Sequence, residues 1–131
     1  MGGYTHKNLR EDIPDAAADH EVSGVEARFG RTSIESEQLG VSLFRYEPNF
    51  RAPFGHRHRE QEEAYVVVSG SGRMKLGDDL IDLRRWDVVR VAPEVMRGIQ
   101  AGPEGLELIA VGGPRPEDGD GEMDPNWWPV D

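Results

Sequence analysis

Short apolar runs separated by turn-forming residues dominate the middle of this chain and limit the folds that it can adopt. From residue 39 to residue 111, apolar and polar residues alternate, as at Leu39, Val41 and Leu43, or cluster in β-branched runs such as residues 65–68. Alternation with a period of two is typical of a strand that buries one face. Glycine, proline and aspartate between the runs indicate frequent turns. This pattern favours an all-β sandwich or small barrel.

We expect seven or eight short strands in a chain of 131 residues, which is the size of one domain. The clearest cover residues 39–44, 65–68, 73–76, 80–83, 88–91, 97–101 and 106–111. The glycine-containing segments 69–72 and 102–105 are predicted to be turns between successive strands. Four apolar side chains in or near these strands are predicted to line or fill the barrel, namely Met74, Leu76, Met96 and Ile99.

The two ends of the chain differ from this region, so we divide the chain into three parts. Residues 1–20 are a polar N-terminal arm in which Pro14 limits any helix to about one turn. Residues 21–111 are the β-barrel. Residues 112–131 are an acidic C-terminal tail that carries half of the net charge of −10. Three roles are open for Trp127 and Trp128 in this tail: a lid over the barrel mouth, a dimer contact, or an anchor on the chain's own barrel. We favour the last two.

Composition excludes several classes of protein. The chain has no cysteine, which excludes disulfides, thiolate metal sites and cysteine nucleophiles. It has 15 basic and 25 acidic residues and would repel a phosphate backbone, so we expect no nucleic-acid partner. No apolar run approaches the roughly 18 residues of a membrane span, and the first residues do not resemble a signal peptide. We therefore expect a cytoplasmic protein that does not bind membranes.

His56, His58 and Glu63 form the pattern with the clearest chemical meaning. Alternate residues of a strand point to the same face, so a strand over this segment would present both imidazoles side by side. A chain reversal would then bring Glu63 beside them on the neighbouring strand. Two imidazoles and one carboxylate suit a divalent transition metal such as iron, manganese, zinc, nickel or copper. A bare pair of histidines at this interval is more often an exposed strand end, so the spacing of all three residues carries the prediction.

This spacing resembles the first sequence motif of the cupin superfamily. His56, His58, Glu63 and Gly70 stand at the intervals of that motif, and the six residues before Gly70 select Glu63 over Glu62. The similar region runs from about residue 39 to residue 111. The resemblance implies a double-stranded β-helix, which is the jelly-roll barrel of cupins. It also implies a homodimer, which agrees with the tendency of exposed sheet edges to pair.

The sequence departs from the cupin motifs at several positions. Phe50 replaces the glycine that leads the first motif, and Trp86 replaces the glycine that begins the second. Arg97 stands where metal-binding cupins have their third histidine. Arginine cannot be a metal ligand, because its guanidinium stays protonated and offers no lone pair. The resemblance therefore implies three ligands, with Arg97 at the fourth position.

Arg97 leaves two functions open. In the first, the two histidines and Glu63 bind a divalent metal, and the chain is an enzyme acting on a small anionic or carbonyl compound. Arg97 would then bind the charge of the substrate, and Tyr65 would donate a hydrogen bond to it. In the second, Arg97 pairs with Glu63 and no metal binds. The barrel then holds a small-molecule ligand for sensing or storage.

Overall fold

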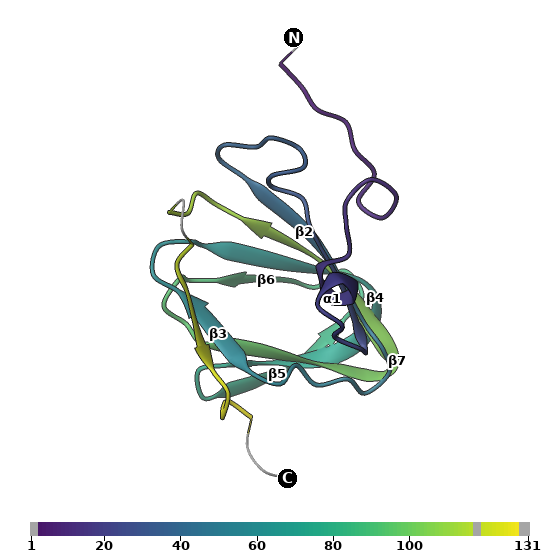
Figure 1. Ribbon diagram of the computed structural model, residues 1–131. Helices are drawn as coiled ribbons and strands as arrows, with labels where there is room; N and C mark the ends of the chain where they lie inside the picture. The colour runs from purple at the N-terminus through teal and green to yellow at the C-terminus, as the bar shows by residue number, and fades with distance from the viewer. Residues whose placement is uncertain (1–2, 117–118, 129–131) are drawn as a thin grey trace.

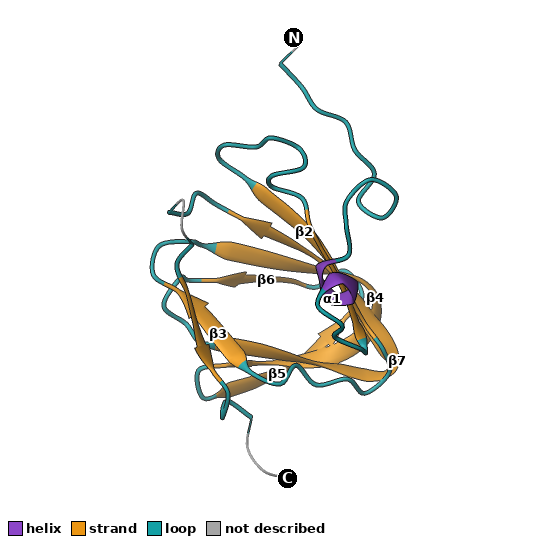
Figure 2. Ribbon diagram, in the orientation of Figure 1, coloured by secondary structure: helices purple, strands orange, loops and turns teal. Residues whose placement is uncertain are grey.

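The structure, a computed structural model, describes residues 3–116 and 119–128 and confirms the all-β prediction. Within these residues, eight strands curl around a common interior and one short helix, α1 (Ala16–Asp19), lies beside them (Figure 1, Figure 2). The strands are β1 (Val25–Phe29), β2 (Gly40–Tyr46), β3 (Gly55–His58), β4 (Glu63–Leu76), β5 (Asp79–Arg84), β6 (Val88–Val91), β7 (Arg97–Gly112) and β8 (Gly121–Asp124). No helix among the described residues is both long and apolar enough to cross a membrane.

The long strands β4 and β7 form the frame of the barrel. They pair antiparallel along nearly their whole length, from Glu63 opposite Gly112 to Leu76 opposite Arg97. One half of this ladder continues through β6 on one side and through β2 and β1 on the other. The other half continues through β5 on one side and through β3 and β8 on the other. The barrel therefore consists of two half-sheets that share β4 and β7.

The prediction of turns at 69–72 and 102–105 is wrong, because both segments lie inside the continuous strands β4 and β7. The pairing of these strands shifts register twice between residues 67 and 72. Gly70 and Gly105 have positive φ angles of 78° and 82° there. Bulges of this kind bend a strand and increase its twist. The two glycines thus lie where β4 and β7 pass from one half-sheet to the other.

The N-terminal arm is tied to the barrel through Asp15. Its carboxylate caps α1 by accepting a hydrogen bond from the backbone N–H of Ala17, and it accepts a second one from Ala27 on β1, both at 3.0 Å. Ile13 is buried nearby. The short helix agrees with the single turn predicted for the arm. Strand β1 was not predicted, although Val25, Ala27 and Phe29 alternate with two charged residues in the pattern of a strand.

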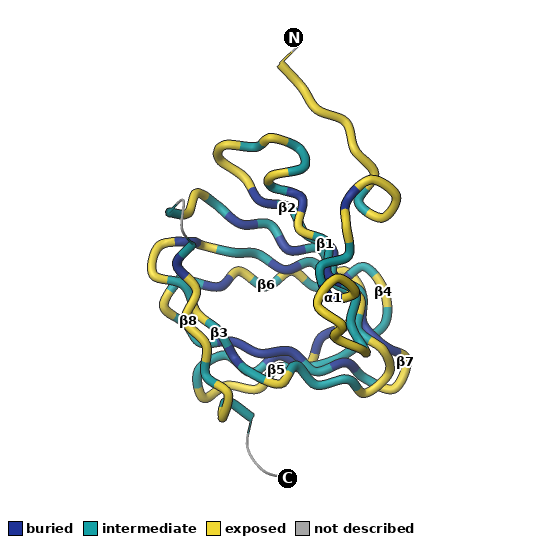
Figure 3. Tube along the Cα trace, viewed as in Figure 1, coloured by how far each residue is buried: buried dark blue, intermediate teal, exposed yellow. Residues whose placement is uncertain are grey.

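The hydrophobic core lies between the two half-sheets. Figure 3 shows buried segments along β4 and β7, which alternate with less buried ones. The buried members of the core are Tyr65, Val67, Met74, Leu83, Val91, Ile99, Ala101, Leu106, Leu108 and Ala110. Leu76 packs against this cluster and Met96 is half-buried. Three of the four predicted core positions, Met74, Leu76 and Ile99, are therefore in or against the core, whereas Met96 is outside the cluster.

Replacing Gly70 with alanine is expected to lower the free energy of unfolding by about 3 kcal/mol. An added Cβ would lie 2.2 Å from the carbonyl oxygen of Gly105, and the positive φ angle would strain any residue with a side chain. Urea denaturation measures the change. Gly121→Ala is the matched control, since its added Cβ has nothing within 4 Å. Equal stability of the two variants would contradict the role assigned to the bend.

Candidate metal-binding site

Strands β3 and β4 bring His56, His58 and Glu63 together, as the sequence predicts. Their three ligand atoms all lie within 4.8 Å of one another. The Nε2 atoms of His56 and His58 are 3.5 and 3.0 Å from Oε1 of Glu63. Atoms bound to one ion at about 2.0–2.2 Å stand roughly 3–3.5 Å apart in tetrahedral or octahedral geometry. The donor set and the two distances to Glu63 are therefore compatible with a single divalent metal ion.

The Glu63 carboxylate is the centre of this group of side chains. The Tyr65 hydroxyl donates a hydrogen bond of 2.8 Å to Oε1, and Nη1 of Arg97 lies 3.6 Å from the same oxygen. Burial would raise the pKa of Glu63, but the hydrogen bonds from His56, His58 and Tyr65 hold that pKa well below its usual value. Burial and the Glu63 charge raise the pKa of Tyr65. Glu63 is therefore ionised and Tyr65 stays a hydrogen-bond donor.

Arg97 is fully buried beside this carboxylate, with 0 % of its surface exposed. It pairs with His56 across β7 and β3, and its Nη2 donates a hydrogen bond of 3.0 Å to the carbonyl of Ala92. Its Nε and Nη1 have no hydrogen-bond partner among the described residues. Buried donors without an acceptor are costly, and a native structure rarely keeps them. Arg97 therefore offers a positive charge and unused N–H groups to an anion.

Asp120 belongs to the site and was missed in the sequence. Its side chain is 1 % exposed, and its Oδ1 lies 2.9 Å from Nδ1 of His58. Its Oδ2 accepts hydrogen bonds from the backbone N–H groups of Glu60 and Gln61, at 2.7 and 2.9 Å. Burial would raise the pKa of Asp120, but these backbone groups and the histidine ring lower it. The local signal is only an aspartate between two glycines, at residues 119–121.

His58 lies between the two carboxylates of Glu63 and Asp120. The hydrogen bond to Glu63 raises the pKa of His58; burial opposes this rise, and the hydrogen bond to Asp120 adds to it. With a proton on each ring nitrogen, His58 bridges both acids. A metal ion on Nε2 would replace one proton and leave the Nδ1–H group on Asp120.

The C-terminal tail packs on the chain's own barrel, which is one of the three roles predicted for Trp127 and Trp128. A Cβ added at Gly55 or Gly98 would lie 2.4 or 2.8 Å from the Trp127 side chain, so these glycines make room for the indole. The Lys75 ammonium lies 3.3 Å from the centroid of the Trp127 ring, a cation–π contact. Strand β8 in the same tail pairs with all four residues of β3. The tail is thus part of the β-structure.

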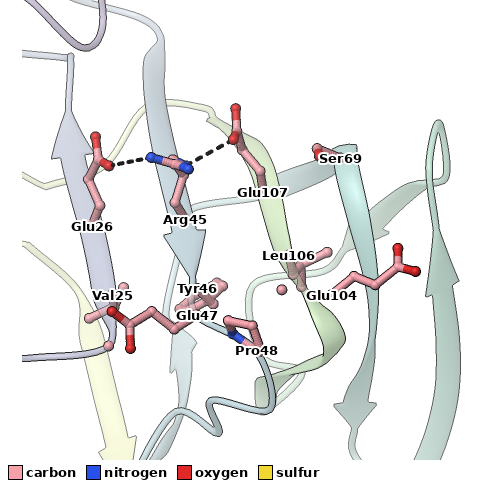
Figure 4. A pocket seen from close by; sticks show the side chains of 12 residues that line it. Val25, Glu26, Arg45, Tyr46, Glu47, Pro48, Ser69, Glu104, Leu106 and Glu107 are labelled. Carbon is pink, nitrogen blue, oxygen red and sulfur yellow. Dashed lines mark hydrogen bonds and ion pairs between the residues drawn. The ribbon is translucent and has the colours of Figure 1, made fainter.

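A cleft of about 370 Å³ lies elsewhere on the surface (Figure 4). Its lining includes four acidic residues, Glu26, Glu47, Glu104 and Glu107. Arg45 forms ion pairs with Glu26 and Glu107, at 3.2 and 3.0 Å. None of the predicted site residues lines this cleft, and its acids are already partly neutralised. The candidate metal ligands lie away from this cleft, around Glu63.

Comparison with known proteins gives structural matches only. No family model matches the chain, and no curated protein matches its sequence. A cupin protein from Bacteroides fragilis is 21% identical over 89% of both chains, with a TM-score of 0.72. KdgF from Halomonas sp. is 18% identical over 90% of this chain and 98% of that one, with a TM-score of 0.68.

Oxalate decarboxylase from Bacillus subtilis is also similar, with 22% identity and a TM-score of 0.64. The match covers 79% of this chain but only 28% of the longer enzyme. These structural similarities confirm the predicted fold. The chain therefore has the double-stranded β-helix fold of the cupin superfamily.

Proposed function

We propose that this chain is a divalent-metal-dependent enzyme that acts on a small anionic compound. His56, His58 and Glu63 would hold the ion, and Arg97 would bind the negative group of the substrate. The observation that supports the proposal is the burial of Arg97 beside the donor set, where its Nε and Nη1 have no hydrogen-bond partner among the described residues. A guanidinium close to a dication is repelled unless an anion lies between them. Since Arg97 does not point outward to solvent, the site suits a metal and an anion together.

The charges around the site support the same substrate class. A divalent ion and Arg97 are positive, and Glu63 and Asp120 are negative, with both histidines neutral when the metal is bound. One positive charge is then left over. A buried net charge is costly unless it is paired, so binding of a monoanionic group would neutralise the site.

Each side chain has a distinct role in this proposal. A bound metal would supply a Lewis acid that polarises an oxygen of the substrate. Arg97 orients the negative group through its free N–H donors. Tyr65 holds Glu63 in place by donating to Oε1. The His56 side chain is 31% exposed, against 13% for His58 and 14% for Glu63, so the substrate would enter past His56.

A small anion as substrate agrees with one of the structural neighbours. The name of oxalate decarboxylase gives a small dicarboxylate as the compound on which that enzyme acts. Oxalate is therefore a reasonable first probe for the present site, although the match covers only 28% of that enzyme.

Protein purified without an affinity tag is expected to contain about one transition-metal ion per chain. His56→Ala is expected to lose most of it, because one of three ligands is removed. Elemental analysis by mass spectrometry measures the content. His20→Ala is the control, since His20 is exposed and lies outside the site. A wild-type protein that holds no metal and takes up no added Mn²⁺, Co²⁺ or Zn²⁺ would contradict the proposal.

Arg97→Met is expected to bind the metal more tightly and the anion more weakly. The variant removes a positive charge next to the ion and removes the donors for the substrate. Loss of a charged hydrogen bond corresponds to about a 10- to 100-fold weaker affinity. Titration calorimetry with Zn²⁺, and then with oxalate on the Zn²⁺-loaded protein, measures both changes. Unchanged oxalate affinity would show that Arg97 does not bind the anion.

A metal-free ligand-binding cupin is the second candidate, because Arg97 approaches Glu63 within ion-pair range. Under this function, Arg97→Met removes the buried positive charge that faces Glu63 and lowers the free energy of unfolding by about 3 kcal/mol. Added Zn²⁺ would then not restore the stability of the variant. In a metal-dependent protein, Zn²⁺ would stabilise the same variant by binding only the folded state. Thermal unfolding with and without Zn²⁺ separates the two functions.

A further inference from the structure

The two oxygens of Asp120 have different partners, and this difference fixes the direction of the carboxylate. Oδ2 accepts two backbone hydrogen bonds, from Glu60 and Gln61. Oδ1 is thereby directed at Nδ1 of His58, at 2.9 Å. The backbone N–H of Arg59 also donates to the Asp120 carbonyl, at 3.2 Å. The loop after β3 and the start of the tail therefore hold each other in one arrangement.

The strand that carries both histidines depends on the same part of the chain. All four residues of β3 (Gly55–His58) have partners on β8, whereas β7 pairs with β3 only at His56 opposite Arg97. Figure 1 shows β8 running along the outer edge of β3. Trp127 packs against Gly55 at the beginning of β3. The tail is thus the main support of the histidine strand.

We propose that Asp120 is a positioning residue that keeps a hydrogen on Nδ1 of His58 and so leaves Nε2 free for the metal. This inference rests on the proposed metal-binding function. A neutral imidazole carries one hydrogen, and the nitrogen without it is the metal ligand. Glu63 lies on the Nε2 side and by itself would draw the hydrogen to that nitrogen. Asp120 opposes this from the other side of the ring.

Asp120→Asn is the decisive variant, because the backbone determines how the new amide must point. The N–H groups of Glu60 and Gln61 need an acceptor, so the amide oxygen takes the place of Oδ2. The amide nitrogen then takes the place of Oδ1 and donates toward His58. Nδ1 must accept that bond, and its hydrogen moves to Nε2. The variant keeps the loop contacts but leaves Nδ1 of His58 without a hydrogen.

Nitrogen-15 NMR of the imidazole rings in the metal-free full chain reads the state of Nδ1. We expect Nδ1 of His58 to carry a hydrogen in the wild type and to lack it in Asp120→Asn; the His58→Ala spectrum assigns the signal. Zn²⁺ affinity, measured in competition with a coloured chelator, is expected to fall about 10- to 100-fold in the same variant. Glu122→Gln is the matched control on β8, since Glu122 pairs with the exposed Arg57. It should change neither readout.

The outcomes separate this inference from the proposed function. A wild-type Nδ1 without a hydrogen overturns the inference, and this result does not require the variant to fold. Equal Zn²⁺ affinity in Asp120→Asn and the wild type overturns it as well. Loss of the His58 Nδ1 hydrogen in Asp120→Asn, in a protein that binds no metal, supports the positioning role and contradicts the metal-dependent function. Zn²⁺ binding by the wild type with an unchanged Nδ1 in the variant contradicts the inference alone.

Discussion

The pairing of β4 with β7 places Glu63 and Arg97 near opposite ends of one ladder, yet their side chains approach to 3.6 Å. The ladder can bring them together because both strands bend, at Gly70 and Gly105, and fold it across the barrel. Everything else at the site is arranged around this contact. Tyr65 follows Glu63 on the same face of β4, and His56 lies opposite Arg97 on β3. The curvature of the barrel is therefore a condition for the contact between Glu63 and Arg97.

The site gathers ionisable side chains that are costly to bury one at a time. Glu63, Asp120 and Arg97 are largely or fully shielded from water, and His58 joins the two acids. Each group is tolerated because another one compensates it, either by charge or by hydrogen bonds. The exception is Arg97, because two of its nitrogens have no hydrogen-bond partner in the part of the chain that the structure describes. That exception is the observation on which the proposed anion site rests.

Local sequence patterns predicted much of the fold and part of the site. The alternation of apolar and polar residues predicted most strands. The spacing of His56, His58 and Glu63 predicted that these three side chains lie close together. Gly70 was misread because glycine marks a bulge inside a strand as readily as a turn between strands. Asp120 could not be predicted, since its partner His58 is 62 residues away in the chain. The partner of such a residue depends on the β3–β8 register, which exists only in the folded barrel.

The late position of β8 in the chain has a consequence for how the protein matures. During synthesis, β3 emerges from the ribosome well before residues 121–124, which supply most of its backbone partners. A nascent chain can form the β4–β5 hairpin early, but β3 can pair fully only after β8 has been synthesised. Contacts between distant segments also close more slowly than local ones. The three candidate metal ligands can therefore reach their final arrangement only after β8 has been synthesised and has paired with β3.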